Sequence, residues 1–175
     1  MDILPALQLG SLVVVYTSHA AREEISHVAA KLALSGPVTV LDGGNRFQAY
    51  RIAHLLRKET TDVGAAANRL FIRRAFTCYQ MLALLENAPV LHQPYLDLDL
   101  LNSFYDDQVQ PQEADRLLKT CMRQINRLRQ FAPVAVTLGQ PLLEERAYLI
   151  EKVCEVADTV FTEETVLQEA QLSLF

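Results

Sequence analysis

The sequence predicts an α/β fold in which a mostly parallel sheet is flanked by helices. The first observation behind this prediction is that short apolar runs alternate with longer segments of helical periodicity. The second is that no repeat, low-complexity tract or Pro/Gly/Ser linker interrupts the alternation. The third is size, because 175 residues, 50% of them hydrophobic, suit one domain with a substantial core. In such sheets, ligands bind at the carboxyl ends of the strands.

The first strand, the first helix and the second strand follow from local patterns. Residues 12–16, LVVVY, form a continuous apolar run that is typical of a strand buried on both faces. Residues 22–36 carry apolar side chains at helical spacing and end in Gly36, a common helix terminator. Residues 37–42, PVTVLD, then predict a short second strand.

The middle of the chain predicts two more helices around a third strand. A helix is expected over residues 46–58, RFQAYRIAHLLRK. Its inward-facing side chains are expected to be Phe47, Tyr50, Ala53, His54 and Leu56. Residues 69–76, RLFIRRAF, predict the third strand, and residues 77–88 predict the helix that follows it.

The last third of the chain continues the alternation. The segment YLDLDLL at 95–101 predicts a fourth strand, and residues 111–131 predict a long helix with apolar side chains at helical intervals. The segment PVAVTL at 133–138 predicts a fifth strand. A helix over 144–157 and a last strand over 158–162 complete the pattern.

Composition excludes several classes of protein. The net charge of −5 and the pI near 5.4 argue against a generally basic nucleic-acid binder. No apolar run reaches the roughly 18 residues of a membrane span, and the start has no basic segment of a secretion signal. A cytoplasmic protein is therefore expected. The cysteines form no CxxC and the histidines no metal-ligand spacing, so we expect neither metal nor cofactor.

The turn after the first strand is where an α/β protein would place a phosphate loop. The turn reads YTSHAAREEI, with no glycine between Gly10 and Gly36 and no lysine before Lys31. A phosphate loop needs glycines to aim backbone N–H groups at phosphate, and a lysine for the outer oxygens. A carboxylate about 4 Å from a phosphate charge is repelled by about 4 kcal/mol at an effective dielectric constant of 20. The sequence therefore predicts a turn that repels a nucleoside triphosphate and lacks the groups that would bind it.

Several weak matches, in the right order over residues 9–162, give the chain a resemblance to the RecA/RadA recombinase family. The segment LDGGNRFQAYRI is similar to the family's IDTExxFxxxRI, and IRRAFTCYQMLALL is similar to xARAFxxxxQxxLL. The segment LDLLNSFYDD resembles the Walker B segment and places Asp99 at its aspartate. The segment VAVTLGQ places Gln140 at the family's sensor-like glutamine. The resemblance implies a P-loop NTPase fold with a degenerate P-loop.

The departures from the family pattern imply a pseudo-ATPase with no catalytic residue. Arg22, Glu23 and Glu24 stand where the family has Gly-Lys-Thr, and Asp106 stands where an arginine would follow the Walker B strand. Gly44 stands where the family has the glutamate that activates water, and loss of a general base alone costs orders of magnitude in rate. The degenerate nucleotide site is expected to comprise Arg22, Glu23, Glu24, Gly44, Asp99 and Gln140.

Two features of the sequence give opposite indications on whether the chain contacts DNA. The region 105–115, which matches the family's first DNA-binding loop, is acidic and should repel phosphates. One helix nevertheless carries a basic stripe at three- and four-residue spacing. The stripe consists of Arg116, Lys119, Arg123 and Arg127. It is either a solvated helix face or a surface for DNA or an acidic partner.

The chain ends in QLSLF, which matches the pentapeptide QL(S/D)LF by which bacterial proteins dock onto the β sliding clamp. The matching residues are Gln171, Leu172, Ser173, Leu174 and Phe175. We therefore divide the chain into a RecA-like domain over 1–163 and a tail over 164–175 that carries the clamp-binding motif. The alternative for this tail is a last helical turn packed on the protein's own sheet.

Together these features predict a non-catalytic RecA-like accessory protein of bacterial DNA repair, recombination or damage tolerance that docks on the clamp. The sequence leaves open whether a repair polymerase or a recombinase is a further partner, and whether the chain forms a homo-oligomer. One alternative is a RecA-fold interaction or oligomerisation module that regulates an active recombinase without clamp binding. A second is an enzyme that holds a metal on Asp42, Asp97 and Asp99.

Overall fold

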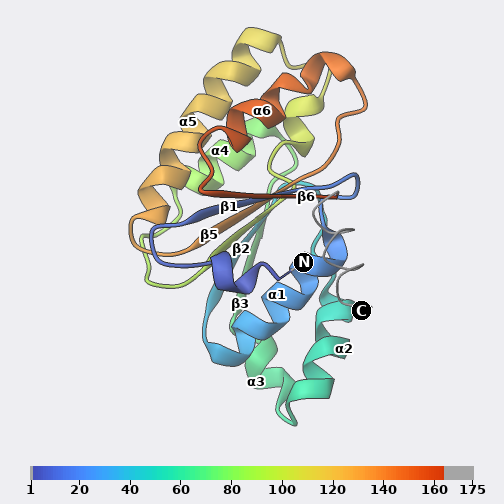
Figure 1. The fold of residues 1–175 in the computed structure, drawn as a ribbon, viewed down its shortest axis with the longest axis vertical. Coiled ribbons are helices and arrows are strands. Elements are labelled where there is room, and N and C mark those ends of the chain that lie inside the picture. The colour runs from blue at the N-terminus through green and yellow to red at the C-terminus, as the bar shows by residue number, and fades with distance from the viewer. Residues whose placement is uncertain (1, 164–175) are drawn as a thin grey trace, which may run out of the picture.

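The computed structural model describes residues 2–163 and has the predicted α/β architecture (Figure 1). Six strands form one sheet in the order β3-β2-β4-β5-β1-β6, and every pair of neighbours is parallel. The class predicted from the strand–helix alternation is therefore confirmed, and it is consistent with a RecA-like, P-loop type of fold.

The strands coincide closely with the apolar runs of the sequence. They are β1 (Leu12–Tyr16), β2 (Val38–Asp42), β3 (Leu70–Arg74), β4 (Tyr95–Leu98), β5 (Val134–Leu138) and β6 (Thr159–Thr162). All residues of β2, β4 and β5 are buried, because helices cover both faces of the sheet at its centre. The two edge strands, β3 and β6, are more exposed. A continuous apolar run thus marks a central strand, as expected for a parallel sheet.

Within the part of the chain that the structure describes, three α-helices cover each face of the sheet (Figure 1). On one face lie α1 (Arg22–Ser35), α2 (Ala49–Glu59) and α3 (Val63–Ala67), and on the other lie α4 (Cys78–Glu86), α5 (Pro111–Arg129) and α6 (Tyr148–Cys154). Alternate strand residues serve the two cores, so Val13 faces the α1 side and Val14 faces the α5 side. Within residues 2–163, the structure has no helix long and apolar enough to cross a membrane.

Short polar signals set the helix ends. The Thr77 side chain accepts a hydrogen bond from the Gln80 backbone N–H at 3.1 Å at the start of α4, and Asp62 does the same for Ala65 at 2.9 Å in α3. Pro111 stands in the first turn of α5, where its missing N–H costs no helical hydrogen bond. Helix α1 ends at Ser35, before Gly36.

The expected inward face of the second helix was correct at Leu56 and at the partly buried Phe47, and wrong at Tyr50 and His54. Tyr50 is 86% exposed and His54 is exposed, whereas Ile52 and Leu56 are buried. Helix α2 begins at Ala49 rather than at residue 46, and its apolar stripe follows the i, i+4 pair of Ile52 and Leu56. The expected helix over 144–157 is also divided, into a 3-10 turn (Glu144–Arg146) and α6.

Candidate functional site at the carboxyl ends of the strands

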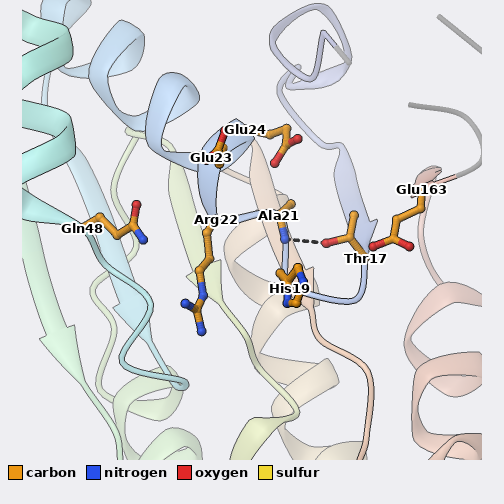
Figure 2. A pocket seen from close by; sticks show the side chains of 8 residues that line it. All are labelled: Thr17, His19, Ala21, Arg22, Glu23, Glu24, Gln48 and Glu163. Carbon is orange, nitrogen blue, oxygen red and sulfur yellow. Dashed lines mark hydrogen bonds between the residues drawn. The ribbon is translucent and has the colours of Figure 1, made fainter. Parts of the chain in front are cut away.

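The turn between β1 and α1 lies at the carboxyl end of the sheet, beside a pocket of ≈ 650 Å³ (Figure 2). Three carboxylates reach this pocket, from Glu23, Glu24 and Glu163. The lining also includes Thr17, His19, Ala21, Arg22 and Gln48. Two of the three acids belong to the degenerate nucleotide site expected from the sequence, so the pocket is rich in negative charge where a triphosphate would need donors.

The backbone of this turn uses its own hydrogen-bond donors. The N–H of Ala21 donates to Thr17 Oγ1 at 2.6 Å (Figure 2). The N–H of Ala20 donates to the Thr17 carbonyl at 3.2 Å. Ala20 and Ala21 both adopt left-handed φ angles, +53° and +48°, which glycine favours. These N–H groups therefore close the turn on itself instead of pointing at a phosphate.

The side chain of Glu163, which follows β6, contacts the same turn. Its carboxylate accepts hydrogen bonds from the Ser18 backbone N–H at 2.6 Å and from the Ser18 hydroxyl. These bonds to Ser18 hold the pKa of Glu163 below its ordinary value. A carboxylate of the chain thus takes a backbone donor that a bound anion would use. No local pattern in the sequence signals this contact, which joins residues 145 positions apart.

A second carboxylate of the turn is held by a neighbouring helix. Arg51 of α2 approaches Glu23 with both terminal nitrogens, Nη1 at 3.1 Å from Oε1 and Nη2 at 3.0 Å from Oε2. This two-point geometry fixes the carboxylate at the pocket rim. Arg51 is therefore engaged in linking α1 and α2.

Asp99, the Walker B-like aspartate, is buried beside β5 and is fully hydrogen-bonded. Its Oδ2 atom accepts from Arg46 Nε at 2.7 Å, and its Oδ1 atom accepts from the Gly139 N–H at 3.0 Å. Its own N–H donates to Thr137 Oγ1 at 2.8 Å. Asp99 has a left-handed φ of +56°, so the chain turns sharply where β4 ends. Arg46 thus supplies the positive charge that neutralises Asp99.

Asp42, at the end of β2, is neutralised in a similar way. Its Oδ1 atom accepts the Arg46 N–H at 2.7 Å, and its Oδ2 atom accepts the Phe47 N–H at 3.1 Å. The Arg74 side chain, from the end of β3, approaches Oδ2 at 3.3 Å. Charged hydrogen bonds therefore hold the loop after β2 against the sheet. The carboxylates of Asp42 and Asp99 both have hydrogen-bond and cationic partners.

Gly44 lies against Asp99 and has no room for a side chain. A Cβ atom at position 44 would lie 2.6 Å from Asp99 Oδ2. A Cβ at Gly43 would lie 2.6 Å from the terminal carbon of Met81. The position at which the family resemblance would put a catalytic glutamate thus accommodates glycine only in this arrangement.

Gln140 is exposed and lies beside rather than within the charged network. It lines a neighbouring pocket of ≈ 390 Å³ together with Tyr16, Ser18 and Glu163. The residue before it, Gly139, donates to Asp99 and accepts from the Tyr105 hydroxyl at 2.9 Å. The residues expected to form the degenerate nucleotide site thus lie at one end of the sheet in three places: Arg22, Glu23 and Glu24 at the first pocket, Gly44 against Asp99, and Gln140 at the neighbouring pocket.

Asp97 is separate from this network. Its side chain is 1% exposed, and neither carboxylate oxygen has a hydrogen-bond partner among the described residues. Burial in the apolar core, followed by the charges of Asp42 and Asp99, raises its pKa well above the ordinary value. The alternative of a metal held by Asp42, Asp97 and Asp99 gains no support, because no group of three metal-ligating side chains occurs within residues 2–163.

The basic stripe of α5 divides into two parts. Arg116, Lys119 and Arg123 are exposed, whereas Arg127 turns toward the end of α4. Arg127 donates to the carbonyl oxygens of Leu85 at 2.9 Å and Ala88 at 3.1 Å, which stabilises a helix C-terminus. The sequence periodicity placed all four on one face, but the long side chain of Arg127 has a structural role.

The expected clamp-binding pentapeptide, Gln171 to Phe175, lies outside the described residues. Neither a protein-family model nor a curated protein matches the sequence. A function for this chain is therefore inferred from its residues and their geometry.

Proposed function

We propose that this chain is a non-catalytic RecA-like accessory protein of bacterial DNA repair or damage tolerance, which docks on the β sliding clamp through residues 171–175. The pentapeptide QLSLF carries the docking half of the proposal. The charged network around Asp99 supports the non-catalytic half, because Arg46 holds the carboxylate and Gly44 leaves no general base.

The physical chemistry of the tail suits a reversible contact. Burial of Leu172, Leu174 and Phe175 in a pocket of the clamp would contribute roughly 1.5–3 kcal/mol each. Ordering the segment and losing translational freedom offset several kcal/mol of this gain. The net free energy is therefore smaller than the burial gain, which corresponds to weak and reversible binding.

The test of docking is calorimetric titration of the full-length protein into a purified bacterial β clamp. The double variant Leu174→Ala/Phe175→Ala should abolish the binding heat. The matched control, Val166→Ala/Leu167→Ala, removes apolar surface from the same tail outside the motif and should bind as wild type. Binding that survives the motif variant, or a wild-type protein that does not bind, would refute docking.

The non-catalytic half is tested separately by titration with ATP and magnesium. The carboxylates around the turn and the occupied donors of Ser18 and Ala21 predict no binding heat. A micromolar nucleotide site would contradict this half and leave clamp docking unaffected.

A second candidate function, an interaction module for a recombinase without clamp docking, is favoured by the edge of the sheet. Strand β3 ends the strand order, so one of its edges carries no strand within residues 2–163. Phe71 is 54% exposed and Phe76 is 71% exposed beside this edge. Open edges with apolar side chains are typical docking places for an extended segment. Copurification with a recombinase that is lost in Phe71→Glu and kept in the tail variant would favour this candidate.

A further inference from the structure

A groove of ≈ 600 Å³ runs between α5 and α6, on the face of the sheet opposite to α1. The floor of the groove is formed by Leu118 and Met122 of α5, which are buried, and its exposed apolar side chain is Val156, which follows α6. Val156 is 41% exposed, although it is a β-branched apolar residue. The groove therefore offers apolar surface to a partner.

The walls of this groove are basic in a chain that is acidic overall. Arg116, Lys119 and Arg123 line it from α5, and Lys152 lines it from α6. Asp115 is the acidic residue in its lining, and its Oδ2 atom is paired with Lys152 Nζ at 2.9 Å across the groove. The lining of the groove thus contains four cationic side chains and one carboxylate, whereas the whole chain has a net charge of −5.

Two of these cations have no carboxylate partner among the described residues. Arg116 is paired with Glu113 at 2.7 Å, and Lys152 is paired with Asp115. Lys119 is exposed, and Arg123 donates to the neutral Thr120 hydroxyl at 3.0 Å. Lys119 and Arg123 are four residues apart, so they present adjacent charges along one wall. A ligand with matching carboxylates would gain most at this place.

We propose that the groove between α5 and α6 binds an acidic amphipathic helix of a partner protein. The lining residues of α5 extend from Gln112 to Asn126, which corresponds to roughly 20 Å along a helix axis. This length suits three to four turns of a partner helix whose apolar side chains reach Met122 and Val156. Glutamate or aspartate residues on the flanks of that helix meet Lys119 and Arg123.

Charge and surface chemistry favour a protein helix over nucleic acid at this groove. A phosphate backbone is bound by cations on an accessible surface and gains little from an apolar floor. Here the floor is apolar, Asp115 of the lining is paired with Lys152, and Glu113, which lies outside the lining, is paired with Arg116. An acidic helix uses both the floor and the walls. This inference goes beyond clamp docking and does not depend on the tail.

The test uses fluorescence anisotropy with the full-length protein and a labelled peptide of about 18 residues. The peptide carries leucine at i, i+3, i+4 and i+7 on one face and glutamate on the other. We expect saturable binding, and an affinity at least about tenfold lower for a scrambled peptide of the same composition. Absence of binding, or equal affinity for the scrambled peptide, would overturn the proposal.

Variants locate the binding place. Lys119→Glu/Arg123→Glu should weaken peptide binding by about tenfold or more, and Val156→Asp should weaken it independently by removing the apolar contact. The matched control is Arg57→Glu/Lys58→Glu, which makes the same charge change at exposed positions of α2 on the other face. An equal loss of peptide affinity in the control variant would show that the groove is not the binding site. A duplex oligonucleotide that displaces the peptide would instead assign the basic wall to nucleic acid.

The tail variant separates this inference from clamp docking. Leu174→Ala/Phe175→Ala should keep the peptide affinity of the wild type while it loses the clamp. Loss of both activities in that variant would mean that the groove is not an independent site.

Discussion

The Nε atom of Arg46 lies 2.7 Å from Oδ2 of Asp99, an aspartate whose side chain is nearly fully buried. Arg46 belongs to the loop after β2, whereas Asp99 follows β4, so the pair joins two neighbouring strands at their carboxyl ends. In this arrangement the chain itself supplies the cation that compensates the buried carboxylate of Asp99.

Arg46→Ala is expected to destabilise the fold by roughly 2–4 kcal/mol, because it leaves the Asp99 charge buried without a cation. Urea unfolding measures this change. Asp99→Asn in the Arg46→Ala background should recover part of the loss, since it removes the uncompensated charge. Arg57→Ala, an exposed arginine of α2 without an ion pair among the described residues, is the control and should change stability by less than about 0.5 kcal/mol. Equal effects of the two arginine variants would contradict this role of Arg46.

Gly44→Ala is expected to destabilise the fold by roughly 1–3 kcal/mol, because the new Cβ would lie 2.6 Å from Asp99 Oδ2. The matched control is Gly64→Ala in α3, where the nearest atom to the new Cβ is 3.8 Å away. That change should stabilise the helix by about 0.5–1 kcal/mol. Thermal unfolding of both variants checks the opposite signs. If Gly44→Ala is as stable as the wild type, the loop moves to accommodate the added Cβ atom and the expected steric conflict with Asp99 does not arise.

The strands were predictable because central strands of a parallel sheet are apolar on both faces. Residues 12–16 and 133–138 predicted β1 and β5 in this way. The phase of α2 was less predictable, since Tyr50 and His54 share a helical spacing with Phe47 but are exposed, whereas Ile52 joins the predicted Leu56 in the core. The short helix α3, with the sequence VGAAA, has too few large side chains to show a period.

The site was predictable only in its composition. The sequence identified Glu23, Gly44 and Asp99 by their places in the chain. It did not identify Arg46 as the partner of Asp99, because that contact joins residues 53 positions apart and depends on the strand order. Glu163 was missed for the same reason, since β6 must first pair with β1 to bring it to Ser18. Local patterns report elements, whereas such contacts follow from topology.

The three cysteines should differ in reactivity toward a thiol reagent at about pH 8. Cys78 and Cys121 are buried, whereas Cys154 is partly exposed, and burial raises the pKa of all three thiols. We therefore expect at most one slow equivalent in the native protein and three after denaturation, since the thiolate is the reacting form. Cys154→Ser should remove the native equivalent, whereas Cys78→Ser should leave it. Rapid native reaction of two thiols would contradict the burial of the core cysteines.

Asp97 gives the fold a pH dependence that can be assigned to one residue. Its pKa is raised in the folded protein by burial, whereas the unfolded chain has the ordinary value of about 3.9. Between these two values the folded state binds more protons than the unfolded state, so stability falls as pH rises above about 4. The contribution of one group to this slope is at most about 1.4 kcal/mol per pH unit.

Asp97→Asn removes the titrating group with little change in size. Because the variant has no carboxyl group at this position, its stability relative to wild type should increase as the pH rises above about 4. Urea unfolding at several pH values measures the difference. Asp107→Asn, at an exposed position before α5, is the control for the loss of one carboxylate. If the difference between Asp97→Asn and wild type is constant over this range, the carboxyl of Asp97 does not titrate differently in the two states. A polar partner would then have to satisfy it inside the core.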